Sequence, residues 1–356
     1  MFENSLRGSY AIRLHGGAVM DYRTFGNTSL RVSEIGLGCS QLGGTSNSDK
    51  QVLSRLLEAF DRGINFFDTA DVYAQGRSER LLGQAFKRNR SNIIIATKAG
   101  YQLTAAGRLG AWLKPVLRPA LRLASSFRRP VQGTGASLKR QTFSPDYLSR
   151  AIDGSLRRLQ TDYLDIFQLH NPSCDVITTG AFIETLESAK SEGKIRWYGV
   201  SCRTVDDALL CLRYSGISTV QIPINFLQFE GVPSFLALSK RANVAVIARQ
   251  PFASGFLARR DANLKSKHVS GDQFGYKVER AKAFQFLELK NHRTIAQAAL
   301  EFVLRLPGVS LVIAGMNSQE HLNENLAAPA RPLSQEEIAQ IYAVFSQAAR
   351  TNSINT

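Results

Sequence analysis

Residues 64–98, INFFDTADVYAQGRSERLLGQAFKRNRSNIIIATK, contain two short apolar runs separated by a longer amphipathic one. The runs INFFDT (64–69) and NIIIATK (92–98) have the length and the continuous apolar character of strands that are buried on both faces. Between them, SERLLGQAFK (78–87) repeats its apolar residues with the period of a helix. The stretch therefore predicts a strand–helix–strand unit of a parallel sheet.

The same alternation continues on both sides of this unit. One strand-like run with its amphipathic partner precedes it, EIGLG (34–38) with DKQVLSRLLEAFDRG (49–63). After the unit, SPDYLSRAIDGSLRRL (144–159) is the amphipathic partner of NIIIATK, and five more pairs follow. The later strand-like runs are DYLDIFQLH (162–170), IRWYGVS (195–201), TVQIPIN (219–225), VAVIARQ (244–250) and SLVIAG (310–315). Eight such units predict the α/β class and a closed (β/α)₈ barrel of the TIM type. A doubly wound sheet is disfavoured, because GLGCSQLGG (36–44) does not match the dinucleotide fingerprint G-x-G-x-x-G.

Some segments fall outside the repeat. We expect one domain over residues 20–350 that begins with a polar hairpin, and an N-terminal extension over residues 1–19 that is disordered. The segments 101–143 and 253–290 are much longer than ordinary βα loops. Both follow strands, so they belong to the C-terminal face of the barrel, where active sites are built. They are candidate lids or substrate walls, and surface insertions without a direct role are the alternative.

Composition excludes several classes of protein. The 356 residues are 44% hydrophobic and 21% charged, which is typical of a globular chain. No apolar run approaches the roughly 18 residues that span a bilayer, and residues 1–19 do not resemble a secretory signal. Four cysteines and five histidines lack metal-binding spacing, so we expect no metal site and a reducing, cytoplasmic location. The cysteines are Cys39, Cys174, Cys202 and Cys211.

The net charge of +15 is concentrated in one segment, residues 103–141, which contains eight cations and no Asp or Glu. The cations are Arg108, Lys114, Arg118, Arg122, Arg128, Arg129, Lys139 and Arg140. This concentration argues against a general nucleic-acid surface. The basic insertion could be a solvated loop, an amphipathic element that meets anionic lipid or an acidic partner, or a wall that attracts phosphorylated substrates.

Four polar residues stand at the ends of consecutive strand-like runs. Asp68 ends INFFD, Lys98 ends NIIIATK and His170 ends DYLDIFQLH, while Tyr73 follows Asp68 by five positions. Each residue alone could be a helix cap, a solvated loop residue or a core histidine. Together, three ionisable groups at one barrel mouth would desolvate one another at a cost unless they pair. We therefore predict that these four residues form a catalytic site.

The set suits proton exchange at a carbonyl oxygen. A tyrosine with an ordinary pKa of about 10 is a poor acid or base at neutral pH, and a neighbouring cation lowers that pKa. We expect Lys98 to lower the pKa of Tyr73 in this way, and Asp68 to keep Lys98 charged. His170 could donate a hydrogen bond to the substrate oxygen and fix its position.

Five motifs in order resemble the aldo-keto reductase superfamily, and the resemblance runs from Met20 to Phe345. The motifs are FFDTADVY (66–73), IIIATKAG (93–100), SLRRLQTDYLDIFQLH (155–170), GKIRWYGVS (193–201) and VIAGMNSQEHLNENLAA (312–328). The resemblance implies a (β/α)₈ barrel, an NADP(H) cofactor, and a catalytic tetrad of Asp, Tyr, Lys and His at Asp68, Tyr73, Lys98 and His170.

The resemblance also implies the residues that contact the cofactor. They are Ser201 and Gln221 at the nicotinamide carboxamide, Arg249 stacked on the nicotinamide ring, Gly315, Met316 and Ser318 at the phosphate and ribose, and Glu324 and Asn325 at the adenine. Two positions depart from the family pattern: Cys202 replaces a frequent Asn, and the neutral Asn317 replaces a cation that binds the 2′-phosphate. NAD(H) therefore stays open beside NADP(H), and Arg259 or Arg260 could supply the missing charge.

These observations predict an NAD(P)H-dependent oxidoreductase that reduces an aldehyde, ketone or sugar carbonyl to an alcohol, or catalyses the reverse reaction. The alternative is a cofactor-binding regulatory or sensor subunit that resembles potassium-channel β subunits. An intact tetrad favours turnover. The expected partner is a small-molecule substrate. An anionic substrate would suit the basic insertion. The sequence indicates no particular oligomeric state.

Overall fold

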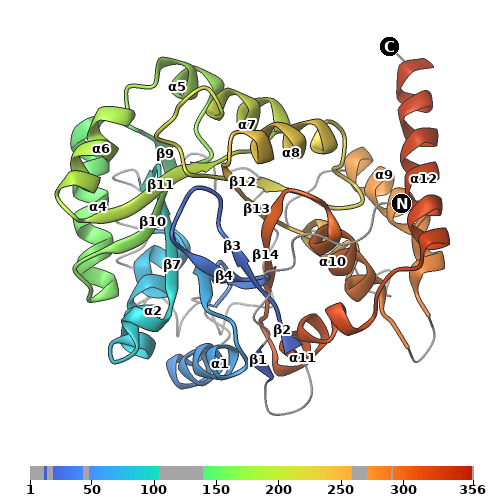
Figure 1. Ribbon diagram of the computed structural model, residues 1–356, viewed down its shortest axis with the longest axis horizontal. Helices are drawn as coiled ribbons and strands as arrows, with labels where there is room; N and C mark the ends of the chain where they lie inside the picture. Colours follow the sequence, from blue (N-terminus) through green and yellow to red (C-terminus); the bar gives the residue numbers. More distant parts are fainter. Residues whose placement is uncertain are drawn as a thin grey trace, which may run out of the picture.

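The computed structural model describes residues 12–13, 19–42, 48–103, 139–258, 271–289 and 292–354. A closed barrel of parallel strands lies at its centre, with helices packed around it (Figure 1). Around the barrel the strands follow the order β10, β11, β12, β13, β14, β5, β6, β7. Their bounds are Ile35–Gly38 (β5), Phe66–Asp68 (β6), Ile94–Ala99 (β7), Leu164–His170 (β10), Ile195–Ser201 (β11), Thr219–Pro223 (β12), Ala245–Arg249 (β13) and Val309–Gly315 (β14). The pairing of β14 with β5 closes the barrel and confirms the predicted α/β architecture.

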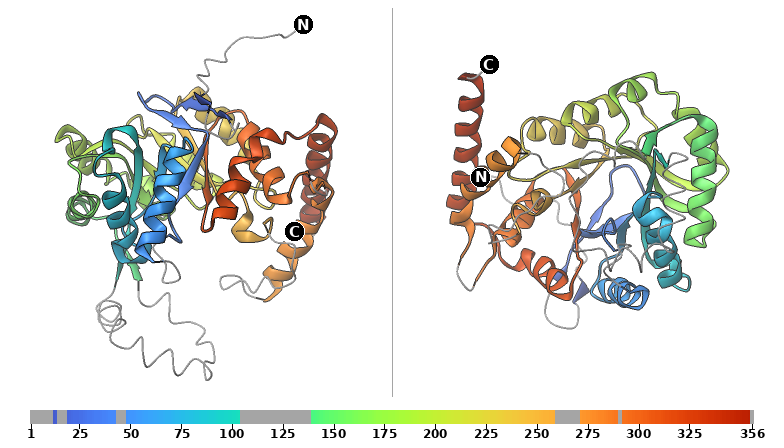
Figure 2. Two further views of the ribbon diagram at one scale, coloured as in Figure 1. Left: turned by 90° about the horizontal axis from the view of Figure 1, so that it is seen from below. Right: turned by 180° about the vertical axis from the view of Figure 1, so that it is seen from behind.

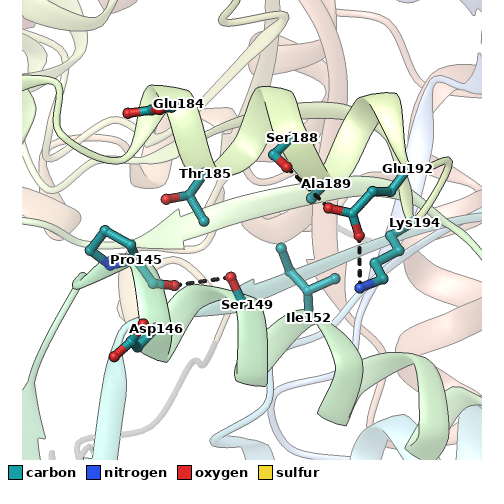
Figure 3. A pocket seen from close by; sticks show the side chains of 10 residues that line it. All are labelled: Pro145, Asp146, Ser149, Ile152, Glu184, Thr185, Ser188, Ala189, Glu192 and Lys194. Carbon is teal, nitrogen blue, oxygen red and sulfur yellow. Dashed lines mark hydrogen bonds and ion pairs between the residues drawn. The ribbon is translucent and has the colours of Figure 1, made fainter.

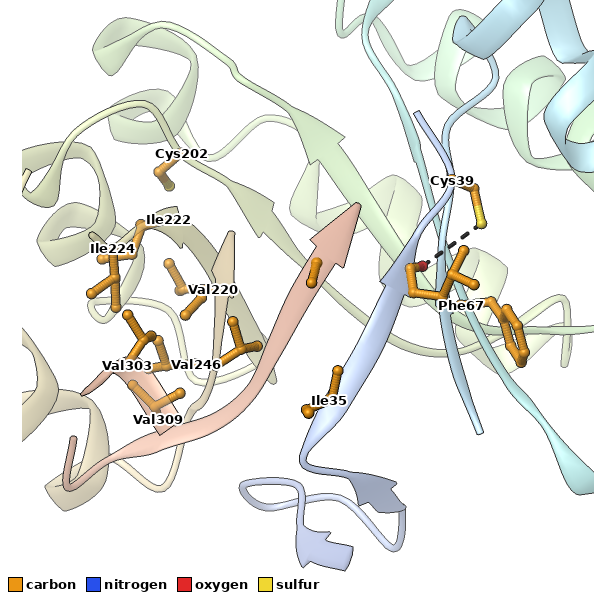
Figure 4. Close-up of a cluster of buried hydrophobic side chains, with 14 of the residues drawn as sticks. Ile35, Cys39, Phe67, Cys202, Val220, Ile222, Ile224, Val246, Val303 and Val309 are labelled. Atoms are coloured by element: carbon orange, nitrogen blue, oxygen red, sulfur yellow. Dashed lines mark hydrogen bonds between the residues drawn. The ribbon is translucent and has the colours of Figure 1, made fainter. Parts of the chain in front are cut away.

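The helices that follow the strands form an outer ring. They are α1 (Asp49–Asp61), α2 (Arg77–Phe86), α4 (Pro145–Leu159), α6 (Ile183–Ser191), α7 (Val205–Cys211), α8 (Val232–Arg241), α10 (Ile295–Arg305) and α11 (Gln319–Leu326). Local sequence determines where several of them begin: Ser48 with Gln51, and Thr294 with Gln297, form capping boxes. The main hydrophobic core fills the layer between strands and helices, as Figure 4 shows around Ile35, Val220 and Val303.

A second cluster fills the inside of the barrel and joins it to the predicted hairpin. The hairpin consists of β3 (Tyr22–Thr24) and β4 (Arg31–Ser33), paired antiparallel. Its Phe25, Leu30 and Val32 pack against inward-facing residues near the strand starts: Phe66, Ile94, Ile166, Ala245, Ile247 and Leu311. A Cβ on Gly26, in the hairpin turn, would lie 2.6 Å from the amide nitrogen of Ala245. The hairpin therefore seals the N-terminal end of the barrel, where Figure 2 (left) shows it in blue.

The two long segments, 101–143 and 253–290, leave the barrel at its C-terminal end, opposite the hairpin. After β7, the strands β8 (Tyr101–Leu103) and β9 (Lys139–Gln141) pair antiparallel, and residues 104–138 of the predicted insertion lie outside the described residues. The second segment contains the helix α9 (Gly271–Lys282), which we did not expect from its two glycines and sparse apolar residues. Arg259 and Arg260 also lie outside the described residues.

Near the N-terminus, β1 (Ile12–Arg13) pairs with β2 (Val19–Met20), so a short ribbon interrupts the extension expected to be disordered. The rest of residues 1–18 lies outside the described part, and there the expectation stays a prediction. Two further helices, α5 (Cys174–Thr179) and α12 (Gln335–Ile354), complete the fold, with α12 at the edge of the helix ring (Figure 1). Among the described residues, no helix is long and apolar enough to cross a membrane.

Candidate active site

The structure brings the four predicted catalytic residues together at one end of the barrel. Asp68 ends β6, Lys98 lies next to the end of β7 and His170 ends β10. Lys98 Nζ donates hydrogen bonds to Asp68 Oδ1 (2.6 Å) and to the carbonyl oxygen of Thr69 (2.7 Å). The side chains of Lys98 and Asp68 are only 1% and 4% exposed. Because a buried charge needs a partner, this pair fixes the ammonium group below the mouth.

Tyr73 is held in place by an unusual turn. The turn η1 (Tyr73–Gly76) has left-handed backbone at three successive residues, with φ of 46° at Ala74, 57° at Gln75 and 79° at Gly76. Such angles cost about 1–3 kcal/mol at each residue other than glycine and tend to occur at functional sites. The turn places the Tyr73 ring centroid 5.4 Å from Lys98 Nζ. The ring also meets His170 edge to face, with 5.8 Å between centroids.

The pKa of Tyr73 differs from the sequence expectation. Burial raises the pKa of Tyr73 above its ordinary value, and the nearby Asp68 carboxylate adds to this effect. The charges of Lys98 and Arg249 lower the pKa, as expected, but they do not outweigh burial. The prediction was right about the effect of Lys98 and wrong about the net shift, because sequence does not report how deeply the phenol is buried.

Three residues near His170 were not predicted. The Tyr101 ring meets the His170 ring edge to face, with 4.9 Å between centroids. Gln141 Nε2 donates to the carbonyl oxygens of His170 (3.3 Å) and Asn171 (2.8 Å). Asn171, which has a φ of 52°, donates its backbone N–H to the carbonyl oxygen of Ser201. Tyr101 and Gln141 lie on the β8–β9 ribbon, so the base of the insertion forms one wall of the site.

The predicted nicotinamide ligands Ser201 and Gln221 form a buried chain of hydrogen bonds with Asp68. Ser201 Oγ donates to Gln221 Oε1 (3.0 Å), and Gln221 Nε2 donates to Asp68 Oδ1 (2.8 Å). Both residues are 1% exposed. The chain orients the amide of Gln221 and connects the predicted cofactor pocket to the predicted tetrad.

Arg249 extends from the end of β13 toward the same mouth. Its Nη2 donates to the carbonyl oxygen of Cys202 (2.8 Å) and to Asn171 Oδ1 (3.4 Å), while the buried Nε has no hydrogen-bond partner among the described residues. Burial lowers the pKa of Arg249 from its ordinary value. A planar, partly unsatisfied guanidinium fits the predicted role of covering a nicotinamide ring.

The predicted phosphate and adenine ligands gather around the start of α11. Ser318 caps this helix by accepting a hydrogen bond from the backbone N–H of His321 (3.1 Å). Helix N-termini favour phosphate groups. Asn325 Nδ2 donates to the carbonyl oxygen of Gly315 (3.3 Å), which ties the helix to the end of β14. The adjoining Met316 is completely buried.

The surroundings of Glu324 and Asn317 complete this end of the site. Glu324 accepts a hydrogen bond from the Thr294 hydroxyl (2.7 Å) and lines a cavity of about 640 Å³ between α10 and α11. Asn317 Nδ2 donates to Gln41 Oε1 (2.6 Å), and the guanidinium of Arg55 donates to the carbonyl oxygen of Asn317. A cation that we did not predict, Arg55, therefore lies beside the neutral Asn317.

Another hollow, of about 360 Å³, lies outside the barrel between α4 and α6 (Figure 3). Ser149, Ser188, Glu192 and Lys194, which line it, make hydrogen bonds or ion pairs, and none of the predicted site residues lies there. In the part of the chain that the structure describes, no cluster of His, Cys, Asp or Glu could hold a metal ion. The barrel mouth thus remains the candidate active site.

Asp71 lies in the loop that joins Asp68 to Tyr73 and carries a strongly perturbed carboxyl group. Its backbone N–H donates to the carbonyl oxygen of Lys98 (3.0 Å), and the Tyr147 hydroxyl donates to Asp71 Oδ2 (3.2 Å). Burial, reinforced by the charge of Glu79, raises the pKa of Asp71 to about 7. The folded protein therefore keeps a proton on Asp71 at pH values where the unfolded chain has released it.

This retained proton predicts a pH dependence of stability. Between about pH 4 and pH 7 the folded state binds more protons than the unfolded state, so the contribution of Asp71 to stability falls as the pH rises. Asp71→Asn should remove this loss, and its melting temperature should exceed that of the wild type by at least about 2 °C at pH 8 and by less at pH 5. Calorimetry at both pH values measures this, with the exposed Asp146→Asn as the control. An equal effect at both pH values would contradict the prediction.

Comparison with known proteins agrees with the barrel and with the site at its mouth. The sequence model of the aldo/keto reductase family matches residues 34–345. The uncharacterized oxidoreductase YqkF of Bacillus subtilis (strain 168) is 34% identical over 331 residues, which cover 90% of this chain and 94% of that protein.

Solved structures extend the comparison to three dimensions. The holo form of aldo-keto reductase AKR11C1 from Bacillus halodurans has a TM-score of 0.72 and 29% identity, covering 91% of this chain and 96% of that one. An aldo-keto reductase from Klebsiella pneumoniae in complex with NADPH has a TM-score of 0.64 and 25% identity, covering 91% and 94%. The chain therefore belongs to the aldo/keto reductase family and is an NAD(P)-dependent oxidoreductase.

Proposed function

We propose that the protein reduces the carbonyl group of a small aldehyde, ketone or sugar to an alcohol, or catalyses the reverse oxidation, with Tyr73 as the general acid and base. The buried ion pair of Lys98 and Asp68 beside the Tyr73 ring carries this proposal. A cation next to a phenol stabilises the phenolate that remains after proton donation.

In this mechanism Tyr73 donates its hydroxyl proton to the carbonyl oxygen as that oxygen gains negative charge. Lys98 stabilises the resulting phenolate, and Asp68, which accepts a hydrogen bond from Lys98 Nζ, holds the ammonium group in place. His170, whose ring lies edge-on to Tyr73, donates a hydrogen bond that orients the substrate oxygen. A bound nicotinamide supplies or accepts the hydride.

The cofactor would be held by the residues around the mouth. Ser201 and Gln221 would bind the carboxamide, Arg249 would cover the ring, and the start of α11 at Ser318 would bind phosphate. Glu324 and Asn325 would contact the adenine. Two buried atoms support this fit: Arg249 Nε and Asn317 Oδ1. Neither has a hydrogen-bond partner among the described residues, so each is free to bond to a polar group of the cofactor.

We propose a small substrate with an anionic group, and no role for nucleic acid. Arg203, at the rim, donates a hydrogen bond to the Tyr101 hydroxyl, and Arg249 lies deeper in the mouth. The predicted basic insertion follows the same strand as Lys98. We place the protein in the cytoplasm, where its free cysteines would stay reduced.

A cofactor-coupled activity screen over neutral aldehydes, ketones, sugars, phosphorylated aldehydes and sugar nucleotides tests the function. Multiple turnovers with any of these compounds support the proposed enzyme. A stoichiometric burst without turnover across the panel would instead favour the regulatory or sensor subunit. A higher kcat/KM for phosphorylated aldehydes than for neutral ones supports the anionic substrate.

The cofactor preference follows from the neutral side chain at position 317. We expect the affinity for NADPH to exceed that for NADH by less than about tenfold, because Asn317 brings no charge to the 2′-phosphate. Asn317→Arg should raise the preference for NADPH by about tenfold or more, since a charge-assisted pair contributes roughly 1.5–3 kcal/mol. Fluorescence titration with both reduced cofactors measures this.

Single alanine variants of Arg55, Arg259 and Arg260 serve as controls. A wild-type preference of a hundredfold or more would contradict the prediction and would mean that another cation binds the 2′-phosphate. The alanine variant that abolishes such a preference would then identify that cation. Arg55 comes first, because it already contacts the backbone of Asn317.

A further inference from the structure

Gln168 places an unsatisfied amide inside the barrel. It lies in β10, two residues before His170, and its side chain is completely buried. Neither Oε1 nor Nε2 has a hydrogen-bond partner among the described residues. Burial of an amide without hydrogen bonds is costly, and such groups in folded proteins usually pair with protein or with ordered water.

Thr219 places a second unsatisfied group on the same inner surface. In the parallel pairing, Gln168 is opposite Gly199, and Gly199 is opposite Thr219. Residues in register point to the same side of a sheet. Gln221, two residues after Thr219, reaches Asp68 inside the barrel, so this side is the interior. Thr219 Oγ1 is also buried without a partner in the described structure.

Gly199 lies between the two residues in the sheet, and Thr219 packs closely against it. A Cβ at Gly199 would lie 2.6 Å from Thr219 Cγ2 and 2.0 Å from the carbonyl oxygen of Thr219. A larger residue at this position would therefore displace the backbone of β12 as well as the Thr219 side chain. On its other side, Gln168 is in register with Lys98. Ile166, one inward-facing position below Gln168, belongs to the apolar cluster.

We infer that Gln168 and Thr219 bind an internal water molecule across Gly199, and that this hydrated pair is a positioning element for Lys98. Water suits the site because it can accept from the amide N–H and donate to the amide or hydroxyl oxygen at once. In this arrangement the water packs beneath the buried polar side chains at the mouth, which include Lys98. On the side toward the N-terminal end, the interior of the barrel is apolar. The effect on catalysis rests on the proposed function of Tyr73 and Lys98, whereas the water site does not.

High-resolution crystallography and steady-state kinetics on the full chain test the inference. The wild type should show a water within hydrogen-bond distance of Gln168 and Thr219, and Gln168→Leu and Thr219→Val should lack it. Both variants should lower kcat about tenfold with KM changed by less than about twofold, as expected when a catalytic group is displaced. Thr219→Ser, which keeps the hydroxyl, should retain the water and the wild-type kcat.

Ile166→Val is the matched control, because it trims the interior without removing a polar group; it should lower the melting temperature and leave kcat unchanged. A wild-type structure without this water would overturn the inference. So would Gln168→Leu with a raised melting temperature and wild-type kcat, because the amide would then be merely unsatisfied. If Tyr73→Phe retained the wild-type rate, the proposed function would fail, and the crystallographic result would still decide the water site.

Discussion

Replacing Tyr73 by phenylalanine should lower kcat for carbonyl reduction by about 10²-fold or more and leave cofactor affinity nearly unchanged. The substitution keeps the aromatic ring, whose centroid lies 5.4 Å from Lys98 Nζ, and removes only the hydroxyl. General acid catalysis contributes roughly 10²–10⁴-fold, so its loss should appear almost entirely in the chemical step. Stopped-flow measurement of NADPH oxidation, with a fluorescence titration of the cofactor, separates the two quantities.

Tyr101→Phe is the control for this experiment. Tyr101 also packs edge-on against His170, but its hydroxyl accepts a hydrogen bond from Arg203 at the rim. Its loss should change kcat by less than about tenfold, because no proton transfer is removed. Reduction at the wild-type rate by Tyr73→Phe would exclude Tyr73 as the proton donor.

Lys98→Met should also lower kcat by about 10²-fold, and it should move the alkaline limb of the pH profile for reduction to higher pH. Reduction needs a protonated Tyr73, so the rate falls as the pH passes the pKa of that residue. The Lys98 charge lowers this pKa, and its removal therefore raises it. The profile of kcat against pH, measured for both proteins over the alkaline range, reports the shift.

The variant also leaves the carboxyl group of Asp68 buried, with its hydrogen bond from Gln221 intact. Removing one partner of a buried pair destabilises a protein by about 3–5 kcal/mol, so circular dichroism must first establish that the variant is folded. The double variant Lys98→Met/Asp68→Asn relieves the uncompensated carboxylate and should recover stability but not rate. A folded variant whose pH profile matches that of the wild type would show that Lys98 does not tune Tyr73.

The sequence was sufficient to predict the barrel and the meeting of Asp68, Lys98 and His170. Each residue ends or nearly ends an apolar run, and a closed parallel barrel brings the ends of all its strands to one mouth. Topology therefore determines the neighbours of a strand-end residue. The same argument applies to Ser201 and Arg249, which end β11 and β13.

Other features depend on distances that periodicity does not encode. Tyr101 and Gln141 reach His170 only because the β8–β9 ribbon folds back over the mouth. The raised pKa of Tyr73 reflects the depth of the phenol, and a strand pattern reports burial of the backbone, not of a loop side chain. From the sequence, Gln168 is only a polar residue in a buried strand. The structure shows that its amide has no hydrogen-bond partner among the described residues.

The hairpin that seals the N-terminal end of the barrel has a consequence for how such a protein can evolve. The packing of Phe25, Leu30 and Val32 is concentrated at that end, while the predicted chemistry lies at the other. Substitutions under the hairpin should therefore change mainly how much folded protein a cell accumulates, and substitutions in the loops of the mouth should change mainly what is recognised. Because the hairpin packing and the predicted site lie at opposite ends of the barrel, substitutions that alter specificity at the mouth can be tolerated while the packing at the sealed end maintains stability.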